Sequence, residues 1–140
     1  MIQILTHIID VVKGKTTLTK MRSPKWESFR KEWLTTNNCC AVCGNTKNLE
    51  VHHIKPFKDF PELELDKNNL ITLCEKTTLI GNCKINCHLQ IGHDGNFKFY
   101  NDTLNSEIIE INRFKENVHF KINEYVKERN LLRKEKYKSK

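Results

Sequence analysis

The sequence predicts a small α+β domain that is held together by a structural zinc ion. Cys40-x-x-Cys43 has the spacing of a zinc knuckle. Two short apolar segments, Leu49–Ile54 and Leu70–Cys74, predict strands, and helical patterns stand on both sides of them. With 140 residues, the chain is long enough to bury the modest core of one domain.

The first helix is expected to begin at Ser23-Pro24, where a serine N-cap precedes a proline at the first helical position. Four apolar residues then fall on one helical face: Trp26, Phe29, Trp33 and Leu34. Base stacking is one use for exposed tryptophans, but a shared stripe indicates core packing. Residues 1–22 form an N-terminal extension, either a strand or a loose segment.

After the strands, a short helix is expected from about Asn86 to Gly92, since glycine suits a helix C-terminus. Residues 23–104 would form the central domain, and residues 105–140 one long amphipathic helix with a basic tail. The apolar residues of that helix recur at seven-residue intervals, with Lys115 and Arg129 as interruptions: Ile111, Val118, Tyr125 and Leu132. This stripe indicates packing across the domain; a dimerising or partner-binding helix is the alternative.

The charge balance indicates a polyanionic partner. Lys and Arg number 24 against 17 acidic residues, which gives a net charge of +7. The segment Lys127–Lys140 alone holds seven basic and two acidic residues. Such a tail fits nucleic-acid phosphates, although a merely solvated terminus is the alternative. No apolar run is long enough to span a bilayer and no basic leader is visible, so we expect an intracellular, cytoplasmic protein.

The order of histidine, asparagine and cysteine residues indicates metal-assisted phosphodiester hydrolysis. The chain has VHHIKPF, then DKNNLITLC, then NCHLQIGH. This reaction needs an activated water and a cation that stabilises the developing charge, and histidine can serve both needs near neutral pH. His52 and His53 are neighbours on a predicted strand, so their side chains point to opposite sides and should have different tasks.

The segments LEVHHIKPF, PELELDKNNLITLC and CHLQIGHDGN resemble the HNH (ββα-metal, His-Me finger) endonucleases, in particular small phage-type members, over about Trp26 to Tyr100. The resemblance implies a ββα-metal core and a metal-dependent endonuclease that leaves 5′-phosphate and 3′-hydroxyl ends on double-stranded DNA. It also implies a setting in phage genome packaging, with the packaging machinery as partner, or in homing. A zinc-stabilised DNA-binding module that does not cut is the alternative, and an RNA-directed nuclease or toxin is a further one.

The resemblance also implies roles for single residues. His52 would bind the catalytic ion, His53 would be the general base, and Asn69, or Asn68 if the register differs by one, would hold the loop that carries His53. His88 would be the second metal ligand. His93 lies about 140° round an ideal α-helix from His88, but it becomes a third ligand if the chain curls back at Gly92. Imidazoles suit Zn²⁺, Ni²⁺, Mn²⁺ or Co²⁺, with Mg²⁺ as an alternative.

The structural zinc ligands implied by the resemblance are Cys40, Cys43, Cys74 and Cys87. Ten extra residues separate Cys74 from Cys87 compared with the compact family pattern, which makes Cys83 an alternative to Cys74. Cys39 would be a spare thiol, and a disulfide framework is the alternative to zinc. Nucleic-acid contacts are expected from five basic residues: Lys55, Arg133, Lys134, Lys136 and Lys138.

Overall fold

A computed structural model describes residues 21–75, 85–114 and 122–138, with the side chains of residues 122 and 123 left out. The secondary structure runs in the order α2 (Trp26–Thr36), β1 (Leu49–His53), β2 (Leu70–Cys74), the short π-helix η4 (His88–Gly92), α3 (Leu104–Phe114) and α4 (Ile122–Lys138). Two single-turn helices, Pro61–Leu63 and Lys67–Asn69, lie between the strands. The predicted α+β class, with two strands followed by a short helix, is confirmed. None of the described helices is both long and apolar enough to cross a membrane.

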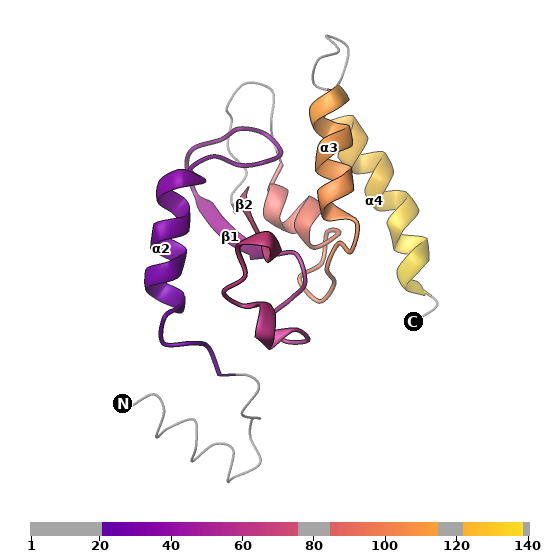
Figure 1. Ribbon diagram of the computed structural model, residues 1–140. Helices are drawn as coiled ribbons and strands as arrows, with labels where there is room; N and C mark the ends of the chain where they lie inside the picture. The colour runs from indigo at the N-terminus through magenta and orange to yellow at the C-terminus, as the bar shows by residue number, and fades with distance from the viewer. Residues whose placement is uncertain (1–20, 76–84, 115–121, 139–140) are drawn as a thin grey trace.

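The two strands form an antiparallel sheet in which Leu49 lies opposite Cys74 and His53 lies opposite Leu70. This register places Cys74 at one end of the sheet and the histidine pair near the other. Figure 1 shows the sheet and η4 at the centre of the molecule, flanked by α2 on one side and by α3 and α4 on the other. Cys74 and His53 therefore lie at opposite ends of the sheet.

Helix α2 begins at Trp26, two residues later than the proline at position 24 predicts. The Ser23 carbonyl accepts from Trp26 N at 3.0 Å and its hydroxyl accepts from Lys25 N, so Ser23 closes a turn ahead of the helix. The predicted apolar stripe is half-buried and faces the sheet. From this stripe, Trp33 Nε1 donates to Thr72 Oγ1 on β2 at 3.0 Å. The indole therefore packs against the protein, as the stripe indicates.

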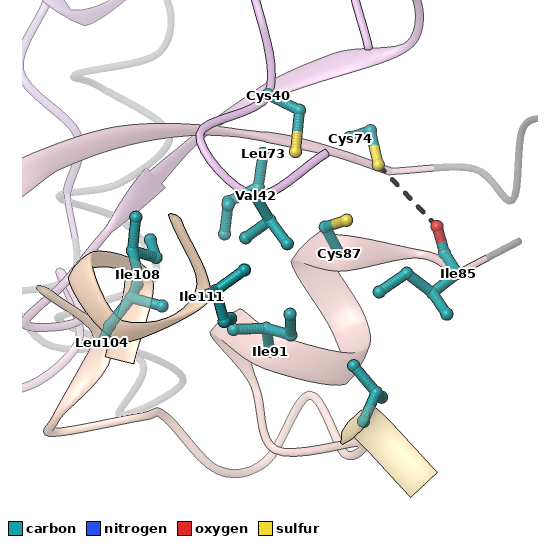
Figure 2. Packing of buried hydrophobic residues seen from close by; sticks show 11 residues of the cluster. Cys40, Val42, Leu73, Cys74, Ile85, Cys87, Ile91, Leu104, Ile108 and Ile111 are labelled. Atoms are coloured by element: carbon teal, nitrogen blue, oxygen red, sulfur yellow. Dashed lines mark hydrogen bonds between the residues drawn. The ribbon is translucent and has the colours of Figure 1, made fainter. Parts of the chain in front are cut away.

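The apolar core joins β2, η4 and α3. Leu73, Ile91, Leu104 and Ile111 are fully buried, and Figure 2 shows them in one cluster with Cys40, Cys74 and Cys87. Each such aliphatic side chain contributes about 1.5–3 kcal/mol when it leaves water. This packing fixes η4 against the sheet and so sets the position of the residues that η4 carries.

The C-terminal region differs from the single long helix that the sequence predicts. In a continuous α-helix, Glu107 and Arg129 would lie about 33 Å apart. In the structure Arg129 Nη2 donates to Glu107 Oε2 at 2.7 Å, so α4 packs back alongside α3. The stripe is also only partly buried, because Leu132 is 77% exposed. Val118 lies outside the described residues.

Candidate metal centres

Four cysteine thiols meet where the knuckle, β2 and η4 come together. Cys40 and Cys43 come from the turn after α2, Cys74 ends β2, and Cys87 immediately precedes η4. All four sulfur atoms lie within 4.8 Å of one another. Figure 2 shows three of them, those of Cys40, Cys74 and Cys87, grouped beside the apolar core. None of the five described cysteines forms a disulfide, Cys39 is exposed outside the cluster, and Cys83 lies outside the described residues.

The geometry of the thiol cluster fits a zinc ion. A tetrahedral site with Zn–S bonds of about 2.3 Å separates its sulfur atoms by about 3.8 Å. Cys43 Sγ and Cys74 Sγ are 3.8 Å apart. A hydrogen bond with Cys43 raises the pKa of Cys40, but hydrogen bonds with Cys74 and Cys87 outweigh it and lower this pKa to about 7. A thiolate is therefore accessible near neutral pH, and a thiolate is the form that binds metal.

Three imidazoles meet in a second cluster, next to the first. His52 comes from β1, His88 begins η4, and His93 follows η4. Their ring centroids are 5.1, 4.9 and 4.8 Å apart in the three pairs, and one nitrogen from each ring lies within 4.8 Å of the others. Burial, followed by the nearby His88, holds the pKa of His52 well below its usual value, and burial also lowers that of His93. Both rings therefore favour the neutral form that ligates metals.

The hydrogen bonds of the three rings leave the same nitrogen available on each. His93 Nδ1 donates to the Phe99 carbonyl at 2.6 Å, and His88 Nδ1 contacts the Glu75 carboxylate. His52 Nε2 is fully buried and has no hydrogen-bond partner among the described residues. An unpaired buried polar atom is costly, and a cation would satisfy it. All three Nε2 atoms are thus free to bind one ion, and this donor set fits the catalytic metal that the sequence predicts.

The π-type hydrogen bonding of η4 explains how His93 joins His88. An α-helix would place residues five apart on different faces, whereas a π-helix bonds residue i to residue i+5 and so places them one above the other. His93 N donates to His88 O at 3.1 Å, which is this bond. Gly92 permits the close approach of η4 to the sheet, because a Cβ there would lie 3.2 Å from His52 Cε1 and 3.0 Å from Leu73 Cδ1.

His53 lies on the opposite side of β1 and is oriented by the protein backbone. Its Nε2 is 2.9 Å from the Glu64 carbonyl, which can only accept, so Nε2 carries the proton and Nδ1 keeps a lone pair. Trp26 packs on the ring at a centroid distance of 4.7 Å. Burial lowers the pKa of His53, so the imidazole is neutral at physiological pH and can accept a proton.

Asn69 fastens the loop that follows His53. The side chain is buried; its Oδ1 accepts from Lys55 N at 2.8 Å and its Nδ2 donates to Lys55 O at 3.0 Å and Leu63 O at 3.3 Å. The neighbouring Asn68 is exposed and only closes a turn with Asp66. The geometry therefore favours Asn69 over Asn68 as the residue that holds the loop.

Comparison with known families adds an independent observation. Residues 40–76 match the model of the family described as HNH endonuclease. Over this segment the chain is similar to the HNH endonucleases. The matched segment contains the first zinc-type cysteine pair, the histidine pair, Asn69 and Cys74, and it ends before the residues of η4. Searches among curated proteins and among solved structures each gave no match.

The structure contains two orienting groups that the sequence does not predict. Glu75 follows Cys74 directly and holds His88 Nδ1 through its carboxylate, but the extra residues between them hide this relation in the sequence. Arg129 is buried; it donates to the carbonyl of Gln90 at 2.9 Å and to Asp94 at 2.6 Å, and so fixes the end of η4. The only signal for Arg129 was its interruption of the apolar stripe.

The basic residues expected to contact nucleic acid fall into two groups in the structure. Arg133 bonds both carboxylate oxygens of Asp94 at 3.1 Å, and Lys136 bonds Asp102 at 3.1 Å. Lys138 pairs with Glu135 on the same helix, and Lys55 and Lys134 are exposed and form no ion pair among the described residues. The structure therefore brings the predicted ligands together in two clusters but divides the predicted basic contacts.

Proposed function

We propose that this protein is a metal-dependent DNA endonuclease that hydrolyses phosphodiester bonds. The observation that carries the proposal is the arrangement around β1. Three imidazoles converge on one side with an unpaired buried Nε2, and a neutral, backbone-oriented His53 lies on the other. The HNH family match over residues 40–76 supports the same reaction class.

The division of labour follows from the orientation of each ring. His52, His88 and His93 would hold a divalent cation through Nε2, and this ion would supply charge stabilisation at the scissile phosphate and the leaving 3′ oxygen. His53 would take a proton from the attacking water at Nδ1, because its Nε2 is committed to the Glu64 carbonyl. Asn69 keeps this carbonyl and the His53 loop in place through Lys55 and Leu63.

The four thiolates have a separate task in this proposal. Cys40, Cys43, Cys74 and Cys87 would bind a structural zinc ion in a closed tetrahedral site. Cys87 and His88 are adjacent, so a single peptide bond links the zinc site to the catalytic site. Zinc binding would thereby fix the start of η4, where the catalytic ligands begin.

The finer parts of the proposal come from the resemblance to small phage-type members. They are double-stranded DNA as substrate, products with 5′-phosphate and 3′-hydroxyl ends, and action in genome packaging or homing. An imidazole site suits Ni²⁺, Co²⁺, Mn²⁺ or Zn²⁺, and Mg²⁺ would need its remaining positions filled by phosphate oxygens and water.

The test is incubation of purified protein with supercoiled plasmid in a panel of these divalent metals. Conversion to nicked or linear DNA by the parent, and its loss in His53→Ala, is the expected result. The His53→Ala variant should still bind DNA, since a general base acts in the chemical step. A parent that binds DNA but cuts it with none of the metals would contradict the endonuclease proposal and indicate a DNA-binding module.

A further inference from the structure

A cation-lined groove lies between α4 and the loop that follows His93. Its volume is about 750 Å³, within the range of roughly 300–1,000 Å³ that ligand sites occupy. Asp94, Gly95 and Asn96, the three residues after His93, form one wall. The other wall is α4, so the groove begins one residue beyond a ligand of the proposed catalytic metal.

The charge of the groove is strongly positive. Three lysines line it at intervals that place them on one face of α4: Lys127, Lys134 and Lys138. The single acidic residue among the lining groups, Asp94, is already neutralised by Arg129 at 2.6 Å and Arg133 at 3.1 Å. Within the part of the chain that the structure describes, Lys138 pairs with the exposed Glu135 of the same helix, whereas Lys127 and Lys134 form no ion pair. Their ammonium groups are therefore available to an external anion.

The other basic face of α4 is already occupied. Arg133 bonds Asp94, Asn101 and Thr103, and Lys136 pairs with Asp102 at 3.1 Å. These side chains attach α4 to the body of the domain. The helix thus separates its cations into one set that holds the fold and another that lines the groove.

The length of the lysine row favours a nucleic-acid strand over a single phosphate group. Lys127 and Lys138 are eleven residues apart, which corresponds to about 16 Å along an α-helix. Successive phosphates of one strand advance by about 3.4 Å along a DNA duplex, so the row spans roughly four or five nucleotide steps. Phe99, whose ring stacks on Tyr137 at 3.9 Å, adds an aromatic surface to the same groove.

We infer that this groove binds the phosphate backbone of the substrate DNA strand beyond the cleavage site, through Lys127, Lys134 and Lys138. The inference rests on the proposed endonuclease function and adds the route of the substrate. The strand passes from the histidine cluster over Asp94–Asn96 into the groove. Lys136 and Arg133 do not take part in this contact.

The test compares two lysines of the groove with a third lysine of the same helix that lies outside it. Lys127→Gln and Lys134→Gln remove groove cations, and Lys136→Gln is the matched control outside the groove. All are made in a His53→Ala background, and binding of a fluorescent duplex is measured by anisotropy between 50 and 200 mM salt. One phosphate contact contributes a slope of about 0.9 in the double-logarithmic salt plot, or about 3.5-fold in affinity over this range.

Each groove variant should lower the salt slope by about 0.9, and Lys136→Gln should leave it unchanged. An unchanged slope in the Lys127→Gln/Lys134→Gln double variant would overturn the inference, as would an equal loss in Lys136→Gln. A free deoxynucleoside monophosphate serves as competitor. If this nucleotide, at stoichiometric concentration, displaces the duplex from the parent but not from the double variant, the groove is a mononucleotide site instead.

The binding and cleavage measurements separate this inference from the proposed function. If the parent cuts plasmid but DNA binding does not depend on the groove lysines, only the inference about the groove is refuted. Groove-dependent DNA binding by a parent that does not cut with any metal would refute the endonuclease proposal and leave the groove standing.

Discussion

Glu75 offers a sharp test of the three-imidazole site, because it touches a proposed ligand and not the metal. Its carboxylate holds His88 Nδ1 and so leaves Nε2 for the ion. Loss of such an outer partner typically weakens metal binding 10- to 100-fold. Glu75 is 35% exposed and His88 16%, so solvent screens part of the interaction. For Glu75→Gln we therefore expect the lower end, about tenfold, or about 1.4 kcal/mol.

The assay is calorimetric titration of Ni²⁺ into protein that retains its zinc, with zinc content measured by elemental analysis. Glu50→Gln is the matched control, because Glu50 lies on β1 and pairs with Arg30 of α2 at 3.0 Å rather than with a histidine. The control should bind Ni²⁺ as the parent does. A dissociation constant for Glu75→Gln equal to that of the parent would refute the assigned orientation of His88, and an equal weakening in Glu50→Gln would show a general charge effect.

Three further predictions concern the base, the two metals and the buried ion pair. His53→Ala should abolish plasmid cleavage with unchanged circular dichroism; cleavage at the parental rate would refute the general-base role. His88→Ala should keep one tightly bound zinc, whereas Cys43→Ser should lose this zinc and misfold. Elemental analysis that finds the zinc lost in both variants would refute the assignment of two separate metal sites. Burial raises the pKa of Glu107, but the ion pair with Arg129 outweighs it and holds this pKa below 4.5. The stability that this pair contributes above pH 4.5 should therefore be lost as acid protonates Glu107. Thermal melting across this pH range should show the loss in the parent and not in Glu107→Gln.

The local elements of the fold were predictable because their signals are local. The Cys40-x-x-Cys43 spacing, the alternation around His52 and the run Leu70–Cys74 each depend on neighbouring residues, and the structure has the knuckle and both strands at those places. The residue types of the proposed metal ligands were also predictable, because thiolates and imidazoles are common metal ligands and stand close together in the sequence. These features need no knowledge of long-range packing.

The parts that the sequence did not predict depend on contacts between distant segments. An α-helical angle sets His93 apart from His88, and only the i to i+5 bond of η4 brings them together. The fold-back of α4 depends on Glu107 binding Arg129, twenty-two residues away, while periodicity alone indicates one continuous helix. The role of Phe99 is carried by its backbone carbonyl, for which no side-chain pattern exists.

The clasp between Asn86 and Glu75 has a consequence for how the length of this chain can vary. Asn86 Nδ2 donates to the Glu75 carbonyl while Asn86 Oδ1 accepts from Leu89 N at 2.9 Å, so the two ends of the segment between β2 and η4 are tied to each other. A change in the number of residues between Glu75 and Asn86 that keeps this clasp should therefore keep the register of the cysteine cluster and the histidine cluster.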